Sequence, residues 1–327
     1  MTNVKIIKED DNFIFEDSVN KDWKYYKYKI LDTLKAMIIK YELENKKIKY
    51  EKKKYHVSLC SIFKDEGKYL KEWVEFHRLI GIDHFYMYDN NSTDNSVEVL
   101  KPYINMGIIS LKKWKKNHAQ LEAYKNGSEI AKNETEWLGF IDIDEFVILN
   151  RQNNIYDILK NFKKRPSVLL YWHLFGTSGL MNRDEKRLVI EDFTIRFPKL
   201  FRIGKCFWNT AFDIDFSAIK NKAWHHSLRC KYEDMENIPP VNTYDEIAFY
   251  NHHIIKKSPM DAHINHYFTK SFCEYEAKSR RGDVYFKKNP HDNDYFFLHE
   301  MMCNTVDYSA YRFLMKLKLA MRSDTEK

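Results

Sequence analysis

The apolar positions of residues 56–149 follow two different spacings in turn. Short apolar and β-branched runs predict four strands, at 56–63, 84–89, 107–114 and 137–149. Between these runs the apolar residues recur every three or four positions, which predicts a helix after each of the first three strands. The first helix has the stripe Leu70, Trp73, Val74, His77 and Ile80, and Gly81 follows at its end. The alternation predicts an α/β fold with a mostly parallel sheet and ligands at the carboxyl ends of its strands.

The fourth run, WLGFIDIDEFVIL at 137–149, carries Asp142, Asp144 and Glu145 near its end. If the run is one strand, its period of two places Asp142 and Asp144 on one face. Two carboxylates so close repel each other, and a hard divalent cation such as Mn²⁺ or Mg²⁺ would offset the repulsion. Such an ion can hold a nucleoside diphosphate as a leaving group. An Asp-x-Asp pair alone is a weak signal, because DIDF at 213–216 is a second copy, for which a surface loop is the simpler interpretation.

Both ends of the chain are basic and have helical patterns. Residues 1–55 place Ile30, Leu34, Met37, Ile38 and Tyr41 at helical spacing, and a lysine-rich stretch follows at 46–54. The stretch at 304–323 predicts a basic amphipathic helix. Either end can be read as a solvated surface helix or as a segment that contacts an anionic membrane surface.

The composition of the chain limits its possible partners and its cellular location. The net charge of +7 permits an acidic partner, of which nucleic acid, a membrane face and a sugar nucleotide are candidates, although it can also serve solubility alone. Five scattered cysteines without a CxxC pair argue against disulfides and structural zinc. No apolar run reaches the roughly 18 residues of a membrane span, and the N-terminus lacks the layout of a signal peptide. We therefore expect a cytoplasmic protein, peripheral at most at the inner face of the membrane.

Other phosphate-handling motifs are missing. A P-loop is absent, which excludes ATP hydrolysis by that route. A phosphatase-type DxDx[TV] motif would need Thr or Val where this chain has Phe146, and the upstream Gly-Ser signature of nucleotidyltransferases is absent. A metal-bound nucleotide sugar remains the favoured ligand.

Four blocks in order carry a resemblance to a known family: SIFKDEGKYLKEWVEFHRLIGIDHFYMYDNNSTDNS, WLGFIDIDEFV, YWHLFGTSG and INHYFTKSFCEYEAKSRRGD. Over roughly residues 56–310, the chain resembles the glycosyltransferase family 2 and family 92 proteins of the GT-A fold. The resemblance implies an N-terminal extension at 1–55, a GT-A catalytic domain at 56–275 and a C-terminal helical segment at 276–327. It also implies an enzyme that transfers a hexose from a UDP-sugar to a glycan or lipid-linked saccharide, with inversion and with Mn²⁺ or Mg²⁺, as in polysaccharide biosynthesis.

The same resemblance assigns site residues. Those expected at the nucleotide sugar are Lys64, Asp65, Glu66, Asp89, Asn90, Asp94, Gln120, Lys270 and Arg281. Asp94 can equally be a helix N-cap, Gln120 a surface residue, and the basic residues a solvated helix face. Those expected at the metal are Asp142, Asp144 and His266, with His263 as a rival for the third ligand.

The residues that would bind the acceptor and the residue that would act as the catalytic base are less well defined by the sequence. The block WHLFGTSG implies an acceptor pocket, in which Trp172 would face a sugar ring unless it lies in the core. The likeness dissolves at 195–250, where a catalytic base is often found; Glu233, Asp234 and Glu236 qualify by residue type, and none is assigned. The pairs His225–His226 and His252–His253 stay without a role.

Two alternative functions are open. The chain could be a basic module that binds polyanions or nucleic acid without catalysis, or it could be an inactive GT-A domain. The lysines are dispersed and no nucleic-acid-binding motif is present, which disfavours the first.

Overall fold

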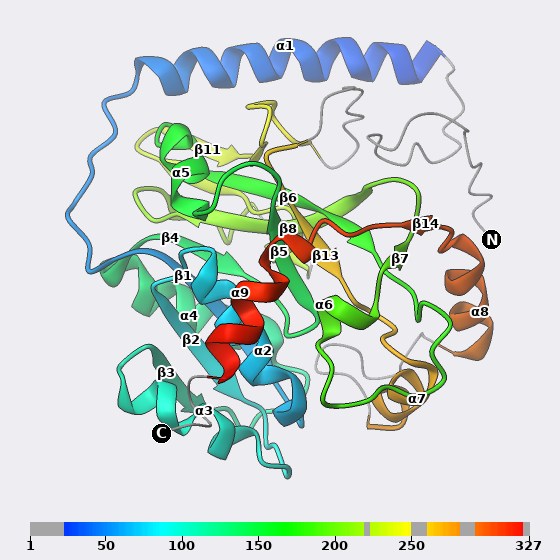
Figure 1. Cartoon of the computed structure of the whole chain (residues 1–327). Helices are drawn as coiled ribbons and strands as arrows, with labels where there is room; N and C mark the ends of the chain where they lie inside the picture. The colour runs from blue at the N-terminus through cyan, green and yellow to red at the C-terminus, as the bar shows by residue number, and fades with distance from the viewer. Residues whose placement is uncertain (1–22, 219–222, 250–259, 282–291, 323–327) are drawn as a thin grey trace.

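A computed structural model of the chain describes residues 23–218, 223–249, 260–281 and 292–322 (Figure 1). The pair His252–His253 lies outside these residues. A sheet of nine strands forms the centre, in the order β3-β2-β1-β4-β8-β6-β13-β5, with β12 beside β6. Its strands are β1 Tyr55–Phe63, β2 His84–Asp89, β3 Ile109–Lys113, β4 Thr135–Phe140, β5 Glu145–Leu149, β6 Ser167–Leu174, β8 Phe201–Asn209, β12 Val241–Asn242 and β13 Ala262–His266.

Helices surround this sheet, and two small sheets extend it. The helices are α1 Trp23–Asn45, α2 Gly67–Leu79, α3 Ser96–Asn105, α4 Gln120–Glu134, α5 Ile155–Leu159, α6 Val189–Asp192, α7 Phe272–Arg281, α8 Asn293–Met302 and α9 Tyr311–Arg322. The small sheets join β9 Asp213–Ile214, β10 Cys230–Tyr232 and β11 Met235–Ile238, and β7 Ile195–Arg196 with β14 Thr305–Val306. None of the described helices combines the length and the apolar character that a membrane span requires.

The first half of the domain follows the predicted rhythm. Strands β3, β2, β1 and β4 pair in parallel, and α2, α3 and α4 connect them. The predicted stripe of α2 is fully buried. Neighbouring residues of β1 belong to different apolar clusters, because Leu59 packs in the cluster that contains residues of α2, α3 and α9, while Cys60 packs in the cluster of α4 and β8. The predicted α/β sheet with helices on both faces is therefore confirmed.

The prediction of one strand at 137–149 is wrong. The chain forms β4, turns at residues 141–144, and begins β5 at Glu145. The two strands have different partners, since β4 pairs with β1 and β8 whereas β5 pairs with β13. The indole N–H of Trp73 lies 3.0 Å from the carbonyl oxygen of Asp142 and 2.9 Å from that of Glu145, so a buried side chain of α2 donates to both ends of the turn. The two aspartates thus lie in a turn beyond β4, and the turn rather than strand periodicity brings them together.

The way in which the later strands join the sheet was not predicted. Strand β8 inserts antiparallel between β4 and β6, and β13 lies between β6 and β5. Because β8 runs against β4, the start of β8 meets the carboxyl end of β4. This places residues from three distant parts of the sequence at the edge where the acidic turn lies.

Candidate active site

A cleft of about 460 Å³ opens at the carboxyl ends of β1 and β4. Its floor is the acidic turn, and its walls come from β6, β8, α7 and α8. The polar and aromatic residues that line it are Phe63, Lys64, Glu66, Gln120, Asp142, Asp144, Trp172, Phe201, His225, His226, His266, Phe268, Lys278, Arg281, Tyr295 and His299. Seven of the twelve predicted ligand-binding residues lie here: Lys64, Glu66, Gln120, Asp142, Asp144, His266 and Arg281.

Asp142 is held by three side chains. Its Oδ2 lies 2.6 Å from Nζ of Lys205, and its Oδ1 accepts hydrogen bonds from Tyr124 at 2.6 Å and Gln120 at 2.9 Å. Burial alone would raise the pKa of Asp142, but the charge of Lys205 and the hydrogen bonds from Lys205 and Tyr124 together outweigh it and hold that pKa below its ordinary value. Asp142 is therefore a fixed anion with both oxygens engaged.

Asp144 faces a different cation. Nζ of Lys278 lies 2.6 Å from Oδ2, and Nε2 of His266 lies 3.6 Å from Oδ1. Burial opposes ionisation here too, yet Lys278 and then His266 hold the pKa of Asp144 well below its usual range. The predicted partnership of Asp144 with His266 is thus present in space. The rival His263 is buried, hydrogen-bonded to Asn265, and is not among the residues that line the cleft.

Glu145 completes the charge balance of the turn. It is fully buried, its Oε2 accepts from the backbone N–H of Asp142 at 2.9 Å, and Nζ of Lys205 lies 3.5 Å away. Its Oε1 has no hydrogen-bond partner among the described residues. Burial raises the pKa of Glu145 well above its ordinary value, which favours the neutral acid. The anions Asp142 and Asp144 then face two lysines, and the turn is close to neutral.

The side chains at this turn fit a divalent cation only in part. Within the described ranges no three Asp, Glu, His or Cys side chains stand close enough together to hold a metal ion. Asp144 and His266 offer a carboxylate oxygen and an imidazole nitrogen side by side, which are ligands that Mn²⁺ accepts. Asp142 is already engaged, and Lys278 occupies one oxygen of Asp144. An ion here would need further ligands from a donor diphosphate or water.

Arg281 organises the rim of the cleft. Its guanidinium donates to the carbonyl oxygens of Lys64 at 2.6 Å and Asp65 at 2.8 Å, and to Oε1 of Glu66 at 2.7 Å. The other oxygen of Glu66 is buried without a hydrogen-bond partner among the described residues. The end of β1 and the end of α7, more than 200 positions apart, are thus joined beside the acidic turn.

The five remaining predicted residues make contacts within the protein behind this rim. Asp89 accepts from the N–H of Ser92, Asp65 from that of Thr93, and Asp94 from those of Gly67 and Ser96. Asn90 donates to the carbonyl oxygens of Trp114 and Lys116. Lys270 is buried, with Nζ 4.2 Å from the ring centroid of Tyr69. These five residues are not among those that line the cleft.

Two lysines and a tyrosine of the site were missed. Lys205 lies in β8, outside the four sequence blocks that carry the family resemblance, and its only signal is a lysine within the apolar stretch FRIGKCFW. Lys278 precedes Arg281 by three positions on α7, a spacing that places both on one helix face. Tyr124 follows Gln120 by one helical turn, and both donate to Asp142.

Aromatic rings form the opposite wall of the cleft. The indole of Trp172 lies 4.6 Å from the ring of His266 and 5.0 Å from that of His226. Burial lowers the pKa of His226 to about 3, so this ring is neutral at pH 7. Nδ1 of His226 faces the carbonyl oxygen of Gly204 at 2.6 Å. Trp172 is partly exposed in the cleft, where an acceptor pocket was predicted.

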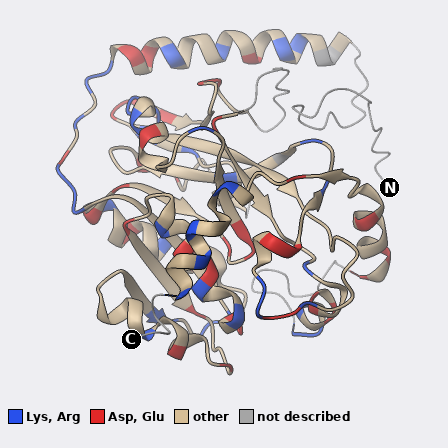
Figure 2. Cartoon of the chain, in the orientation of Figure 1, with Lys and Arg blue, Asp and Glu red and all other residues tan. Residues whose placement is uncertain are grey.

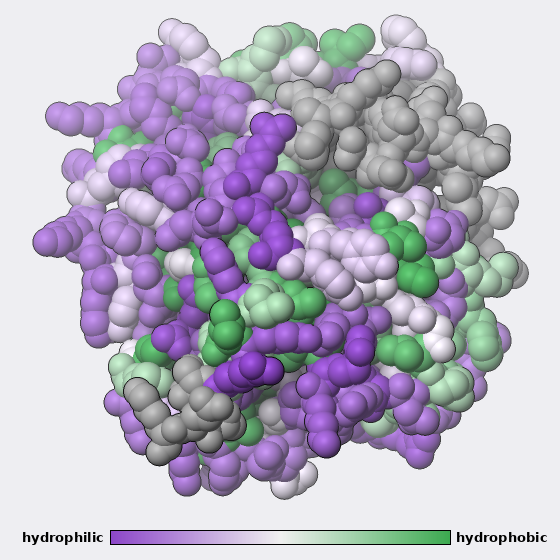
Figure 3. All heavy atoms as spheres, in the orientation of Figure 1, coloured by the Kyte–Doolittle hydropathy of each residue, from purple (hydrophilic) through white to green (hydrophobic). Residues whose placement is uncertain are grey.

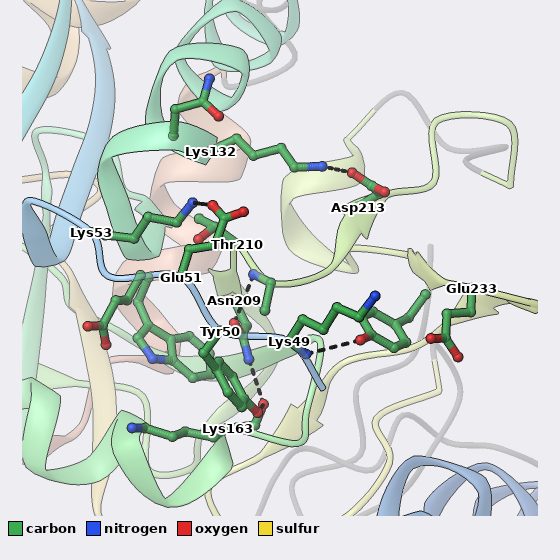
Figure 4. A pocket seen from close by; sticks show the side chains of 15 residues that line it. Lys49, Tyr50, Glu51, Lys53, Lys132, Lys163, Asn209, Thr210, Asp213 and Glu233 are labelled. Carbon is green, nitrogen blue, oxygen red and sulfur yellow. Dashed lines mark hydrogen bonds and ion pairs between the residues drawn. The ribbon is translucent and has the colours of Figure 1, made fainter. Parts of the chain in front are cut away.

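A second pocket, of about 420 Å³, lies near the start of β4 and the end of β8, which is the opposite edge of the sheet (Figure 4). Its lysines alternate with acids, and Lys132 pairs with Asp213 and Lys53 with Glu51. Glu233 lines this pocket and pairs with Lys46. None of the three acids considered as a base, Glu233, Asp234 and Glu236, is among the residues that line the cleft at the acidic turn.

The sequence of this chain is similar to those of known proteins. The model of glycosyltransferase family 92 matches residues 53–277. A family 92 protein of Ricinus communis is 34% identical over 133 residues, which is 39% of this chain and 24% of that protein. One of Oryza sativa subsp. japonica is 28% identical over 151 residues, 45% of this chain and 26% of that protein. These matches thus span about a quarter of each relative's length.

Solved structures show a weaker likeness. A structure of S. aureus TarS 1-349 in complex with UDP-GlcNAc has a TM-score of 0.36 and 12% identity, covering 76% of this chain and 65% of that one. The family model matches more than half of the residues, and its range includes the acidic turn and His266. The predicted family resemblance is confirmed: the chain belongs to glycosyltransferase family 92.

Proposed function

We propose that this protein transfers a hexose from a UDP-sugar to a glycan or a lipid-linked saccharide, with inversion at the anomeric carbon. Membership of family 92 supports glycosyl transfer as the reaction class. The observation that carries the proposal is the turn with Asp142 and Asp144 on the floor of a cleft that also contains His266, Lys278 and Arg281. The proposed setting is the cytoplasmic face of a membrane, where lipid-linked acceptors are found.

The charged residues of the cleft would have different roles in the reaction. Asp142, fixed by Lys205, Gln120 and Tyr124, keeps the shape of the turn. Lys278 and Arg281 offer positive charge to the diphosphate, whose negative charge grows as the bond to the sugar breaks. A divalent cation, Mn²⁺ or Mg²⁺, held by Asp144 and His266, would stabilise the same leaving group.

The acceptor would bind against the aromatic wall of the cleft. The partly exposed ring of Trp172 offers an aromatic face to the C–H face of a sugar ring. His226 is neutral and its Nδ1 faces a backbone carbonyl, so its Nε2 is free to accept a hydrogen bond from an acceptor hydroxyl.

The donor class can be tested directly. Thermal unfolding with UDP-, GDP-, CMP- and dTDP-sugars, each with and without Mn²⁺, should show a selective rise of Tm with a UDP-sugar and Mn²⁺ together, because a ligand that binds only the folded state stabilises it. Release of UDP in the presence of oligosaccharide or lipid-linked acceptors then distinguishes transfer from binding. If no nucleotide sugar raises Tm and polyanions bind with a steep salt dependence instead, the chain is a binding module.

Arg281 has a matched control in its neighbour. Arg281→Gln should weaken UDP binding about tenfold, because it removes a charge-assisted donor from the rim of the cleft. Arg280→Gln should stay within about twofold of wild type, since Arg280 is largely exposed and pairs with Glu276 on the same helix. Calorimetric titration of UDP with Mn²⁺ measures both variants. Equal losses in the two variants would remove Arg281 from the donor site.

A further inference from the structure

Helix α1 has two apolar sides, and one of them faces the rest of the molecule. Leu43 is fully buried, and Ala36 and Ile39 pack against the apolar clusters of the domain. The second half of the helix is also fixed by ion pairs, between Lys40 and Asp245 at 2.6 Å and between Glu44 and Arg165 at 2.7 Å. The docking of α1 is thus accounted for by its inner side, and the helix runs along one border of the molecule (Figure 1).

The outer side of α1 is apolar as well, and it is exposed. We call Trp23, Ile30, Leu34, Met37, Ile38 and Tyr41 the outer stripe; they recur every three, four or seven positions and so lie on one side of the helix. Trp23 is 77% and Tyr41 72% exposed, and the other four are between 48% and 59% exposed. Hydrophobic spheres lie among hydrophilic ones along the border where α1 runs (Figure 3). A continuous apolar row of this kind marks an interaction surface.

Basic residues outnumber acidic ones near the outer stripe. Lys27 and Lys35 are exposed on the helix together with Glu42 and Glu44, and Lys47, Lys49 and Lys52, exposed in the segment that leads to β1, provide the basic excess. Figure 2 shows blue and red segments along α1 and mostly blue ones in the segment that follows it. Aromatic residues at both ends of an apolar stripe and lysines next to it are typical of helices that lie in a membrane interface. The lysines add attraction to anionic lipid headgroups, worth about 1 kcal/mol for each one near the surface.

The basic C-terminal helix does not offer the same surface. The apolar residues Phe313 and Leu317 of α9 are buried in the cluster that α2 also contributes to. Its apolar side is therefore already covered by protein, whereas the outer stripe of α1 is not covered by any described part of the chain.

We propose that α1 lies flat on an anionic lipid bilayer, with the outer stripe in the headgroup region and the lysines on the phosphates. No described helix is long and apolar enough to cross a bilayer, so this contact is along the surface. The proposal rests on the exposed row and its charges, and it holds whatever the chain transfers.

Vesicle co-sedimentation of the full chain tests the contact. Wild type should bind vesicles of phosphatidylcholine and phosphatidylglycerol (7:3) at least about tenfold more tightly than vesicles of pure phosphatidylcholine. Added salt should reduce this difference in affinity. The double variant Leu34→Gln and Met37→Gln should bind the anionic vesicles at least about tenfold more weakly, because two apolar side chains no longer enter the lipid. The matched control, Thr33→Gln with Asn45→Gln, changes two exposed polar positions of the same helix and should bind like wild type.

Three results would overturn the proposal. The first is that wild type binds neither vesicle, and the second is that the Leu34→Gln, Met37→Gln variant binds as wild type does. The third is that wild type sediments as a dimer that the same variant converts to monomer, which would make a second copy of the chain the partner of the outer stripe. Circular dichroism of each variant checks that α1 stays helical, and donor-dependent thermal stabilisation, measured without lipid, should be unchanged in all of them.

Discussion

Replacing Asp144 with alanine is expected to lower transfer about 100- to 1,000-fold while the fold stays intact. Asp144 lies on the floor of the cleft, where it faces both His266 and Lys278. Without its carboxylate, the proposed ion loses a ligand and Lys278 loses the partner that aims it at the diphosphate. The lysine is 30% exposed and can turn to solvent, so the cost in stability is small.

Measurement of kcat/KM against Mn²⁺ concentration, with circular dichroism of the same samples, checks this expectation. The chain supplies a control in the second Asp-x-Asp copy, because Asp213 is exposed and pairs with Lys132 at the far edge of the sheet. Asp213→Ala should therefore keep wild-type activity. Full activity in Asp144→Ala would exclude Asp144 from the catalytic site.

The second large effect concerns stability rather than turnover. Lys205→Met should lower the free energy of unfolding at pH 7 by about 1–3 kcal/mol, because the partly exposed carboxylate of Asp142 loses its cation but keeps the hydrogen bonds from Tyr124 and Gln120. Lys205 is fully buried and faces both Asp142 and Glu145. Lys278→Met should cost less, since Lys278 is partly exposed and Asp144 keeps His266 beside it.

The loss should depend on pH with a defined sign. In the wild type the charge of Lys205 keeps the pKa of Asp142 below its ordinary value against the effect of burial. In Lys205→Met only burial and hydrogen bonds remain, so the folded-state pKa of Asp142 rises above the unfolded one. A carboxyl group shifted upward destabilises the fold once pH exceeds the unfolded pKa, so the variant should recover part of its stability when the pH falls from 7 to 5. Urea unfolding at both pH values measures this, and equal losses at both would contradict it.

Local sequence patterns were sufficient to predict the strands and helices in the first half of the domain. Most predicted strands and helices from β1 to α4 have apolar residues that are buried where the pattern placed them, as the stripe of α2 shows, while the edge strand β3 buries Ile109 and leaves its two lysines exposed. These elements place Asp142 and Asp144, which follow β4, whereas His266, which ends β13 beside them, was predicted from the family resemblance. His266 and His263 are an odd number of positions apart on one strand, so only one of them can face the cleft.

The rest depends on contacts that no local pattern encodes. Ile141, Ile143 and Phe146 are all buried, so the apolar run continues through the turn and conceals the break between β4 and β5. The break is set by distant partners, β8 and β13, and by the indole of Trp73. Lys205 was missed for the same reason, because a lysine in an apolar strand acquires meaning only when the strand is placed beside Asp142.

If the proposed divalent ion and nucleotide donor bind at the near-neutral acidic turn, each should depend on the other for binding. With Lys278 on Asp144 and no donor present, a divalent ion must compete with an ammonium group already in place. A diphosphate that arrives with the ion gives Lys278 a new anion to contact, which lowers the cost of releasing Asp144. By linkage, each ligand then tightens the binding of the other by the same factor. The cleft would hold little metal on its own, and hydrolysis of a donor in the absence of acceptor would be limited by the same joint requirement.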